Sequence, residues 1–326
     1  MPATPPLPRV LAPPAPAAPA TLGADRVELF DDGARVVRLL VDTIAGAQQQ
    51  VDAEIYEFDR RDLLRALLQA RLRGVTVTVI ADPTVARNLA ALAELRRAGA
   101  RVVYYPDDKY QIDHVKLLIV DQRVAMFGGM NWGAGSYRNE DFELRLRGPS
   151  VTRLERIFQT DLAHCGAILS APLPPITAGV QGLVELLVTM PAQDIRPAII
   201  DRIVKARRYI FVEMYVMTDT GVMLGLQDAA ARGVQVFVLF DPEQGLNQLA
   251  VDRLRAGGVF CRFYRSRGEK LHAKAMVVDG SVLVVGSANW STSGFTSNHE
   301  LDAVVESAAI SAMALERMER DWRQSA

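Results

Sequence analysis

The residues with the clearest chemical potential form one short pattern that occurs twice in the chain. In each copy a histidine is followed two residues later by a lysine, five residues after that by an aspartate, and then by a glycine-rich turn that ends in an asparagine. The spacings agree, so the chain carries the same reactive groups twice. The first copy consists of His114, Lys116, Asp121, Gly128, Gly129 and Asn131, and the second of His272, Lys274, Asp279, Gly286, Ser287 and Asn289.

These residue types at these spacings suit a phosphate diester. A histidine and a lysine at alternate positions of a strand point to the same side of a sheet, so each copy presents an imidazole beside an ammonium group. Two such pairs facing each other would form a pocket with two positive charges and two titratable rings. We expect Asn131 and Asn289 to add amide donors to the phosphate, and the glycine turns to let the backbone approach it closely.

Two histidines in one pocket indicate nucleophilic and acid–base catalysis. With an ordinary pKa of about 6.5, an imidazole is a nucleophile when neutral and a general acid when protonated. We expect one histidine to attack phosphorus in line and the other to protonate the leaving group. The phosphohistidine would then be released by water or an alcohol. With four histidines and no HExxH pattern, we expect neither a metal ion nor another cofactor.

Each histidine also needs a carboxylate that fixes its tautomer. Asp121 and Asp279 count among the candidate catalytic residues as members of the motif, but they lie five residues past each lysine, beyond the end of a short strand, so we expect them to brace a turn. The carboxylates that orient the histidines are therefore expected in the segments that follow each asparagine.

The acidic residues after the two asparagines are the better candidates for orienting the histidines. The second half offers Glu300, and the first offers Asp141, with Glu140 and Glu143 as competitors. Asp141 is favoured because the asparagine two residues before it then matches the asparagine two residues before Glu300.

The elements around the two copies also repeat. Period-two apolar runs predict strands and 3.6-period runs closed by glycine predict helices. In the first half we expect strands over 51–58, 75–82, 101–105, 115–120 and 124–127, and helices over 62–74 and 89–97. In the second half we expect strands over 209–217, 234–242 and 259–264, with helices ending at Gly233 and near Gly258.

Special residues agree between the halves at an offset of 159, which indicates an internal duplication. The matched pairs are Glu54 and Glu213, Tyr56 and Tyr215, Gly74 and Gly233, and the Asp-Pro pairs that begin at Asp82 and Asp241.

The duplication predicts an α/β protein of two pseudo-twofold-related α/β/α halves. Each half should have a central mixed sheet, because some neighbouring strands are tight hairpins. We expect each sheet to bring its histidine–lysine strand to one edge, where His114 faces His272. The composition predicts a Pro/Ala-rich disordered leader over 1–25, halves over 26–169 and 183–326, and a linker over 170–182 that contains three prolines.

Overall composition excludes little. A chain of 326 residues with a net charge of −1 is long enough for two domains and has no bulk attraction to a polyanion. No apolar run approaches the roughly 20 residues needed to cross a bilayer. We expect a soluble or peripheral monomer, exported if its N-terminus is a processed one. Whether Cys165 and Cys261 pair stays open.

Together these residues resemble the phospholipase D superfamily, whose signature is two HxKxxxxD motifs, each followed by a Gly-Gly or Gly-Ser turn and an asparagine. The resemblance extends from about Arg26 to Trp322. It implies a metal-independent phosphodiesterase or phosphatidyltransferase with a phosphohistidine intermediate. His114 would be the nucleophile and His272 the acid and base. The groups that would hold the phosphate are Lys116, Lys274, Asn131 and Asn289.

The first half looks closest to cardiolipin synthases and their soluble relatives. The second half departs from them, because SANWSTSGF replaces the arginine-containing segment that those enzymes usually show after the asparagine. A general phospholipase or a nuclease therefore stays open beside a synthase.

Several other residues have both a structural and a functional interpretation. Trp132 and Trp290 are expected to pack beside the turns, and His164 to be structural on a helix, whereas His299 has a smaller chance of lining the pocket. Two interpretations stay open for the duplicated pairs Glu54 and Glu213, and Tyr56 and Tyr215: they reach the site, or they fill the interface between the halves. The expected core methionines are Met126, Met130, Met214, Met217 and Met223, and the expected exposed loop residues are Lys109, Tyr110 and Arg267.

Two functions follow from the sequence. The first is hydrolysis or transfer of a phospholipid head group, with peripheral membrane contact that Phe295 and Leu271 would assist. The alternative is a metal-independent nuclease on single-stranded nucleic acid, for which a basic groove with stacking aromatics is expected. A non-enzymatic binding protein is disfavoured, because every reactive position is filled in both halves. The basic residues near the second motif are Arg262, Arg265, Arg267 and Lys270.

Overall fold

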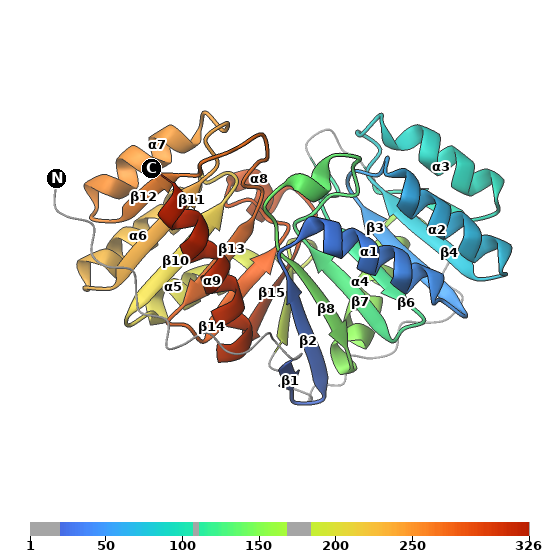
Figure 1. Ribbon diagram of the computed structural model, residues 1–326, viewed down its shortest axis with the longest axis horizontal. Coiled ribbons are helices and arrows are strands. Elements are labelled where there is room, and N and C mark those ends of the chain that lie inside the picture. Colours follow the sequence, from blue (N-terminus) through green and yellow to red (C-terminus); the bar gives the residue numbers. More distant parts are fainter. Residues whose placement is uncertain (1–19, 107–110, 168–183, 326) are drawn as a thin grey trace.

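The computed structural model describes residues 20–106, 111–167 and 184–325, and over them the chain forms two similar α/β halves that lie side by side like the arms of a V (Figure 1). Each half has a mixed sheet flanked by helices, as predicted. The predicted linker, Lys109, Tyr110 and most of the predicted leader lie outside the described residues.

The first half contains an eight-stranded sheet in the order β1-β2-β8-β7-β6-β3-β4-β5. β3, β4 and β5 are parallel, and the other neighbours are antiparallel. Its strands are β1 (Ala20–Leu22), β2 (Asp25–Phe30), β3 (Gln50–Ile55), β4 (Thr76–Ala81), β5 (Arg101–Tyr104), β6 (Lys116–Val120), β7 (Val124–Gly128) and β8 (Glu143–Arg147). Its helices are α1 (Gly33–Ala45), α2 (Arg61–Leu72), α3 (Asn88–Arg97), the 3-10 helix η1 (Ser136–Arg138) and α4 (Pro149–His164).

The second half repeats this plan with a seven-stranded sheet in the order β12-β11-β10-β13-β14-β15-β9. Its strands are β9 (Val184–Val188), β10 (Tyr209–Met214), β11 (Gln235–Phe240), β12 (Phe260–Phe263), β13 (Lys274–Val278), β14 (Val282–Gly286) and β15 (Leu301–Glu306). Its helices are α5 (Ile195–Lys205), α6 (Thr220–Ala231), α7 (Asn247–Ala256), α8 (Thr292–Thr296) and α9 (Ala308–Gln324).

The local sequence explains where these elements begin and end. β10 is buried at every position because sheets and helices cover both faces, which suits its continuous apolar run. The turns after α2 and α6 contain Gly74 and Gly233 with φ values of 89° and 91°, in the left-handed region where a side chain would be strained. Asp219 caps α6 and Ser307 caps α9, each accepting a backbone N–H from the first turn.

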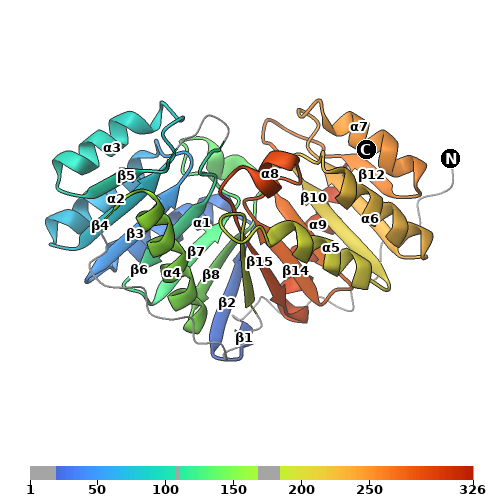
Figure 2. The same cartoon turned by 180° about the vertical axis from the view of Figure 1, so that it is seen from behind.

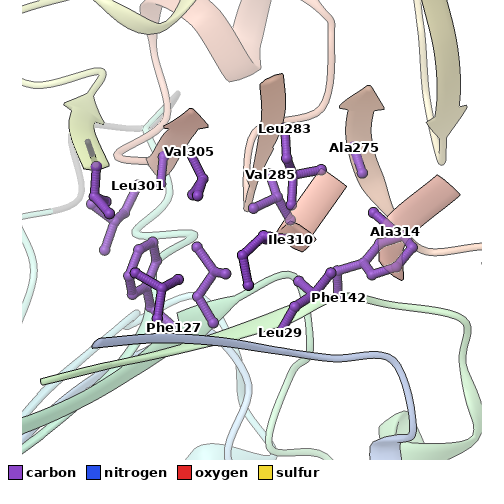
Figure 3. Packing of buried hydrophobic residues seen from close by; sticks show 14 of the residues in the cluster. Leu29, Phe127, Phe142, Ala275, Leu283, Val285, Leu301, Val305, Ile310 and Ala314 are labelled. Carbon is purple, nitrogen blue, oxygen red and sulfur yellow. The ribbon is translucent and has the colours of Figure 1, made fainter. Parts of the chain in front are cut away.

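One apolar core lies between the two sheets and joins the halves (Figure 3). Leu29 and Phe127 enter it from the first half, and Val285 and Ile310 from the second. The last helix of each half packs on its own sheet and also contacts the other one, since α4 contacts β9 and α9 contacts β2. The view from behind in Figure 2 shows α4. Two further cores lie under the outer helices, one in each half.

The structure corrects two expectations about the fold. The histidine–lysine strands β6 and β13 lie inside their sheets, because each is paired with a parallel-sheet strand on one side and a hairpin partner on the other. It is the end of each strand, not an edge strand, that faces the other half. The leader was also assigned too many residues: Ala20–Leu22 pair with Asp25–Val27 as a short antiparallel ribbon. None of the helices over the described residues is long and apolar enough to span a membrane.

Candidate active site

The two histidines stand at the starts of β6 and β13, and each is tied to the opposite half through its backbone. Because β6 runs antiparallel to β3, its start lies at the edge where β3 and β4 end. The N–H of His114 donates to the carbonyl of His299 at 2.9 Å, and the N–H of His272 donates to the carbonyl of Glu140 at 2.9 Å. The repeated motifs therefore meet across the approximate twofold axis.

Each histidine is also paired with a carboxylate from the opposite half. Glu300 Oε2 lies 2.8 Å from His114 Nδ1, and Asp141 Oδ2 lies 2.8 Å from His272 Nδ1. These are the two carboxylates that the sequence favoured, but the partners cross between halves. Neither half alone supplies both an imidazole and the carboxylate that orients it.

The competing carboxylates have other partners. Glu143 accepts the N–H of Met130 at 2.7 Å, and burial raises its pKa well above the ordinary value. Glu140 accepts the hydroxyl of Tyr264 at 3.2 Å and pairs with Arg317. Both carboxylates are therefore engaged away from the imidazoles.

Glu300 is itself held by two side chains that the sequence analysis did not single out for this role. Ser287 donates its hydroxyl to Oε2 at 2.6 Å, and Asn298 donates its amide to Oε1 at 3.0 Å. Ser287 belongs to the duplicated turn and Asn298 to the aligned asparagine pair, so the duplication marked both positions without revealing their partner.

The two lysines are buried beside the histidines, each 2% exposed. Lys116 Nζ donates to the carbonyl of His114, and Lys274 Nζ donates to the carbonyl of His272. Burial lowers the pKa of Lys116 to about 7 and that of Lys274 to about 8. The Lys274 charge also lowers the pKa of Lys116, so the two ammonium groups converge on one region that favours an anion.

The electrostatics favour neutral imidazole rings that are paired with ionised carboxylates. Burial and Lys274 lower the pKa of His272 to about 4, and burial lowers the pKa of His114. Burial opposes ionisation of Asp141 and Glu300, yet the neighbouring histidines and lysines outweigh it and lower both pKa values. At neutral pH each imidazole is then a neutral nitrogen base oriented through Nδ1, and His272 Nε2 also lies 3.1 Å from Lys274 Nζ.

Tyr56 and Tyr215 reach the site, which decides between the two interpretations of this pair. The Tyr56 ring lies 4.9 Å from the His114 ring and 5.2 Å from Lys116 Nζ. Tyr215 lies 4.7 Å from the His272 ring and 5.1 Å from the Lys274 ammonium. An aromatic ring thus flanks each imidazole–ammonium pair. Their companions Glu54 and Glu213 are buried, and over the described residues neither forms a hydrogen bond or an ion pair with His114 or His272.

The glycine-rich turns make room for carboxylates, which differs from the expected close approach to phosphate. A Cβ at Gly129 would collide with Asp141, and a Cβ at Gly286 would collide with Asp302. A Cβ at Gly129 would also lie 3.4 Å from the Gly286 carbonyl oxygen, so the two turns face each other. The side-chain oxygens of Asn131 and Asn289 are buried without a hydrogen-bond partner among the described residues.

Asp121 and Asp279 lie at the other end of the histidine strands and are not brought to the imidazoles. Asp121 accepts the N–H groups of residues 48, 49 and 50 at 2.7–2.9 Å. Asp279 accepts those of residues 207, 208 and 209 at 2.8–3.0 Å. Each strand is five residues long, or about 16 Å, so a direct role in the reaction is not supported.

The structure also decides the role of the other residues that had both a structural and a functional interpretation. Trp132 and Trp290 are buried, as expected for packing, and so are the five methionines. His164 is exposed at the end of α4, and His299 points away from the imidazoles. Phe295 and Leu271 are 3% and 0% exposed, so the expectation that they face lipid is wrong. Both cysteines are free.

Comparison with known proteins shows which family this chain matches. A family model described as cardiolipin synthase, PLD-like domain, matches residues 40–162 and 199–322. The major cardiolipin synthase ClsA of Bacillus subtilis (strain 168) is 26% identical over 334 residues, which cover 90% of this chain and 68% of that protein. A cardiolipin synthase of Geobacillus thermodenitrificans (strain NG80-2) is 27% identical over 317 residues, which cover 86% of this chain and 62% of that protein.

The chain therefore spans about two thirds of the length of these relatives. Among solved structures, phosphatidylserine synthase from Haemophilus influenzae Rd KW20 has a TM-score of 0.69 and 12% sequence identity, covering 92% of this chain and 86% of that one. This likeness shows a shared fold.

Proposed function

The chain belongs to the phospholipase D superfamily, in the family of cardiolipin synthase, PLD-like domains, and we propose that it transfers or hydrolyses the head group of a phospholipid phosphodiester. The crossed pairing of His114 with Glu300 and of His272 with Asp141 carries this proposal. It supplies two oriented imidazoles in one buried site. Two buried lysines add the positive charge that a phosphodiester needs.

In the proposed first step, His114 is the nucleophile. Its Nδ1–H donates to Glu300, which leaves the Nε2 lone pair free to attack phosphorus. The P–N bond forms as the P–O bond to the leaving group breaks. His272 gives its Nε2 proton to the departing oxygen. The negative charge of the bound phosphodiester raises the pKa of His272 from its low value and makes this protonated form accessible.

In the second step, His272 acts as a base. Its neutral Nε2 removes a proton from water or an alcohol, whose oxygen attacks phosphorus while the P–N bond breaks and His114 is regenerated. Lys274 Nζ lies 3.0 and 3.1 Å from the two ring nitrogens of His272, and its charge lowers the pKa of the ring, which favours the neutral form that this second step needs. Neither step draws on a metal ion.

The substrate class is proposed from the relatives, both of which are cardiolipin synthases. The structure supports a lipid over single-stranded nucleic acid in one respect. Arg262, part of the basic segment before the second motif, is engaged internally: its guanidinium lies 4.7 Å from the Trp322 ring centroid and donates to the Trp322 carbonyl. It is therefore not free to follow a phosphate backbone.

A substrate panel tests this function. The protein would be incubated with phosphatidylglycerol vesicles, phosphatidylcholine vesicles and single-stranded DNA, each with and without glycerol as an alcohol acceptor. We expect head-group release from vesicles and a new phosphodiester when glycerol is present. His164→Ala should be fully active, because His164 is exposed outside the site, and His114→Ala should be inactive. Strand cleavage with untouched lipid would contradict the proposal.

A further inference from the structure

A second group of titratable side chains lies near His114 and has no part in the proposed reaction. Glu54 on β3, Asp161 on α4 and His299 from the second half converge on one point. His299 Nε2 lies 3.1 Å from Asp161 Oδ2 and 3.6 Å from Glu54 Oε1. Glu54 and His299 are 0% exposed, and Asp161 is 4% exposed. One oxygen or nitrogen atom from each residue lies within 4.8 Å of the other two.

His299 Nε2 and Asp161 Oδ2 are close enough for an ion pair, but their geometry is not that of a hydrogen bond. Both carboxylate oxygens of Glu54 and Nδ1 of His299 have no hydrogen-bond partner among the described residues. Buried polar atoms are almost always satisfied, so a group of unsatisfied ones that point at each other calls for an occupant. The His299 ring is held in place from its face by Tyr105, which stacks on it at 5.0 Å with an interplanar angle of 9°.

Carboxylates outnumber the one imidazole in this buried region, because Asp113 lies near Glu54 and Asp161. Asp113 Oδ2 is a further buried oxygen without a partner. Over the described part of the chain, no arginine or lysine forms an ion pair with any of these three carboxylates.

The duplicated half offers a matched comparison. Glu213 corresponds to Glu54, and Asp321 on α9 corresponds to Asp161 on α4. Arg317 stands four residues before Asp321 and donates to its Oδ2 at 2.7 Å. Arg317 also pairs with Glu140, the counterpart of His299.

The residue four positions before Asp161 is Ile157, which carries no charge. The second group therefore contains a permanent cation supplied by the protein, and the first has none from this position. An external cation held by the two carboxylates and the neutral imidazole would take the place of that guanidinium.

We propose that Glu54, Asp161 and His299 bind a divalent transition-metal ion such as Zn²⁺, in the role that the Arg317 guanidinium fills in the second half. Ligands about 2.0–2.2 Å from a tetrahedral zinc lie roughly 3.3–3.6 Å from one another, close to the distances between these atoms. One imidazole with carboxylates suits Zn²⁺ or Mn²⁺ better than Ca²⁺ or Mg²⁺, which take oxygen ligands.

The ion has a structural role. Two of its ligands come from the first half and one from the second, so it links the halves beside the active site. The carbonyl of His299 accepts the backbone N–H of His114, which connects the ion to the position of the proposed nucleophile.

The proposal is tested by metal content and thermal stability of the full-length protein, neither of which depends on knowing the substrate. The purified chain would be dialysed against a chelator, loaded with Zn²⁺ or Mn²⁺, freed of loose metal by gel filtration and analysed by mass spectrometry. We expect about one ion per chain and a higher Tm in the loaded form. Glu54→Gln and Asp161→Asn should each lose the ion and the Tm increase.

Glu213→Gln is the matched control, since it removes the equivalent carboxylate from the half that contains Arg317, and it should retain the ion. The proposal is overturned if the wild type retains no ion after loading and its Tm does not change. It is also overturned if Glu54→Gln and Asp161→Asn keep the ion, or if Glu213→Gln loses it equally. Should one variant fail to fold, the visible absorption of Co²⁺ bound to the wild type and its absence in the other variant decide the same question.

Discussion

At the scale of single residues, the site depends on carboxylates that reach across the molecule. Glu300 fixes the tautomer of His114 and Asp141 that of His272, each through Nδ1. This engages both Nδ1 atoms and assigns the Nε2 atoms to the proposed roles of nucleophile and acid. A positioning role for these carboxylates follows, because each acts on the reaction through an imidazole.

Glu300→Gln is expected to lower kcat/KM by about 10²- to 10⁴-fold, since the amide no longer holds the reactive tautomer. Glu300 raises the pKa of His114, so its removal lowers that pKa further. His114 must be neutral to attack, and the acidic limb of the pH–rate profile should therefore shift to lower pH. If the residual activity of the variant shows an unchanged acidic limb, this would argue against the pairing of His114 with Glu300. Glu306→Gln, at the exposed end of the same strand, should leave rate and profile as they are.

The sequence was sufficient to name the histidines and lysines that the structure brings together and the two carboxylates that pair with the histidines, because all of them lie at fixed distances from the motifs. It was not sufficient to assign partners. Spacing along the chain does not say which of two facing histidines a carboxylate meets, so the crossed arrangement emerged only from the packing of the halves. The purpose of Gly129 and Gly286 was missed for the same reason: the atoms that exclude a Cβ are side chains of neighbouring strands.

At the scale of elements, the aspartate of each motif fixes the turn after the histidine strand. Asp121 and Asp279 have φ values of 52°, which is uncommon for a residue with a side chain. Each carboxylate accepts three consecutive backbone N–H groups from the segment that enters the neighbouring strand. The motif thus links the register of two strands while its histidine, at the other end, serves the site.

Asp121→Ala and Asp279→Ala should each lower the free energy of unfolding by about 1–3 kcal/mol, because three backbone donors lose their acceptor. The folded protein should keep its activity. Hydrogen bonds lower the pKa of Asp121 in spite of burial, so its contribution is present above the ordinary aspartate pKa and is lost as pH falls through the lower folded value.

Chemical denaturation at pH 7 and pH 3 measures this effect. Asp252→Ala, which removes an exposed aspartate on α7, should change stability little. Inactivity of a fully folded Asp121→Ala protein would instead place this residue in the chemistry.

The helices and strands that were assigned from the sequence lie within a few residues of their predicted bounds, because apolar periodicity and closing glycines mark them directly; α1, β2, α5 and β9 were among those not assigned. The position of β6 and β13 inside their sheets was not, since strand order depends on pairings between distant segments. The ribbon formed by Ala20–Leu22 was missed because its sequence differs little from the Pro/Ala-rich stretch before it.

At the scale of the whole molecule, the two halves share a core that neither could complete alone. Phe127 and Leu29 pack with Val285 and Ile310, and the last helix of each half contacts the other sheet (Figure 3). The duplication predicted two facing halves. It did not predict that Phe295 and Leu271 would be buried: Phe295 packs into the core of its own half, and Leu271 into the core that the two halves share.

The shared core predicts that both halves unfold in one cooperative transition. Phe127→Ala should lower the free energy of unfolding by about 3–5 kcal/mol and move the whole transition to lower temperature. Leu72→Ala is the matched control, because Leu72 is 77% exposed and contributes little. Scanning calorimetry distinguishes the outcomes: two separate transitions, only one of them shifted, would show that the halves are independent.

The central claim is that both histidines belong to one site, and turnover of His114→Ala, His272→Ala and the double variant tests it most directly. Residues that act as a unit are strongly non-additive, so each single variant should lose at least about 10³-fold in kcat and the double variant should be no worse than either. Head-group release from phosphatidylglycerol vesicles is the readout, with His164→Ala at the wild-type rate. Substantial turnover in either single variant, or losses that multiply in the double variant, would contradict the shared site.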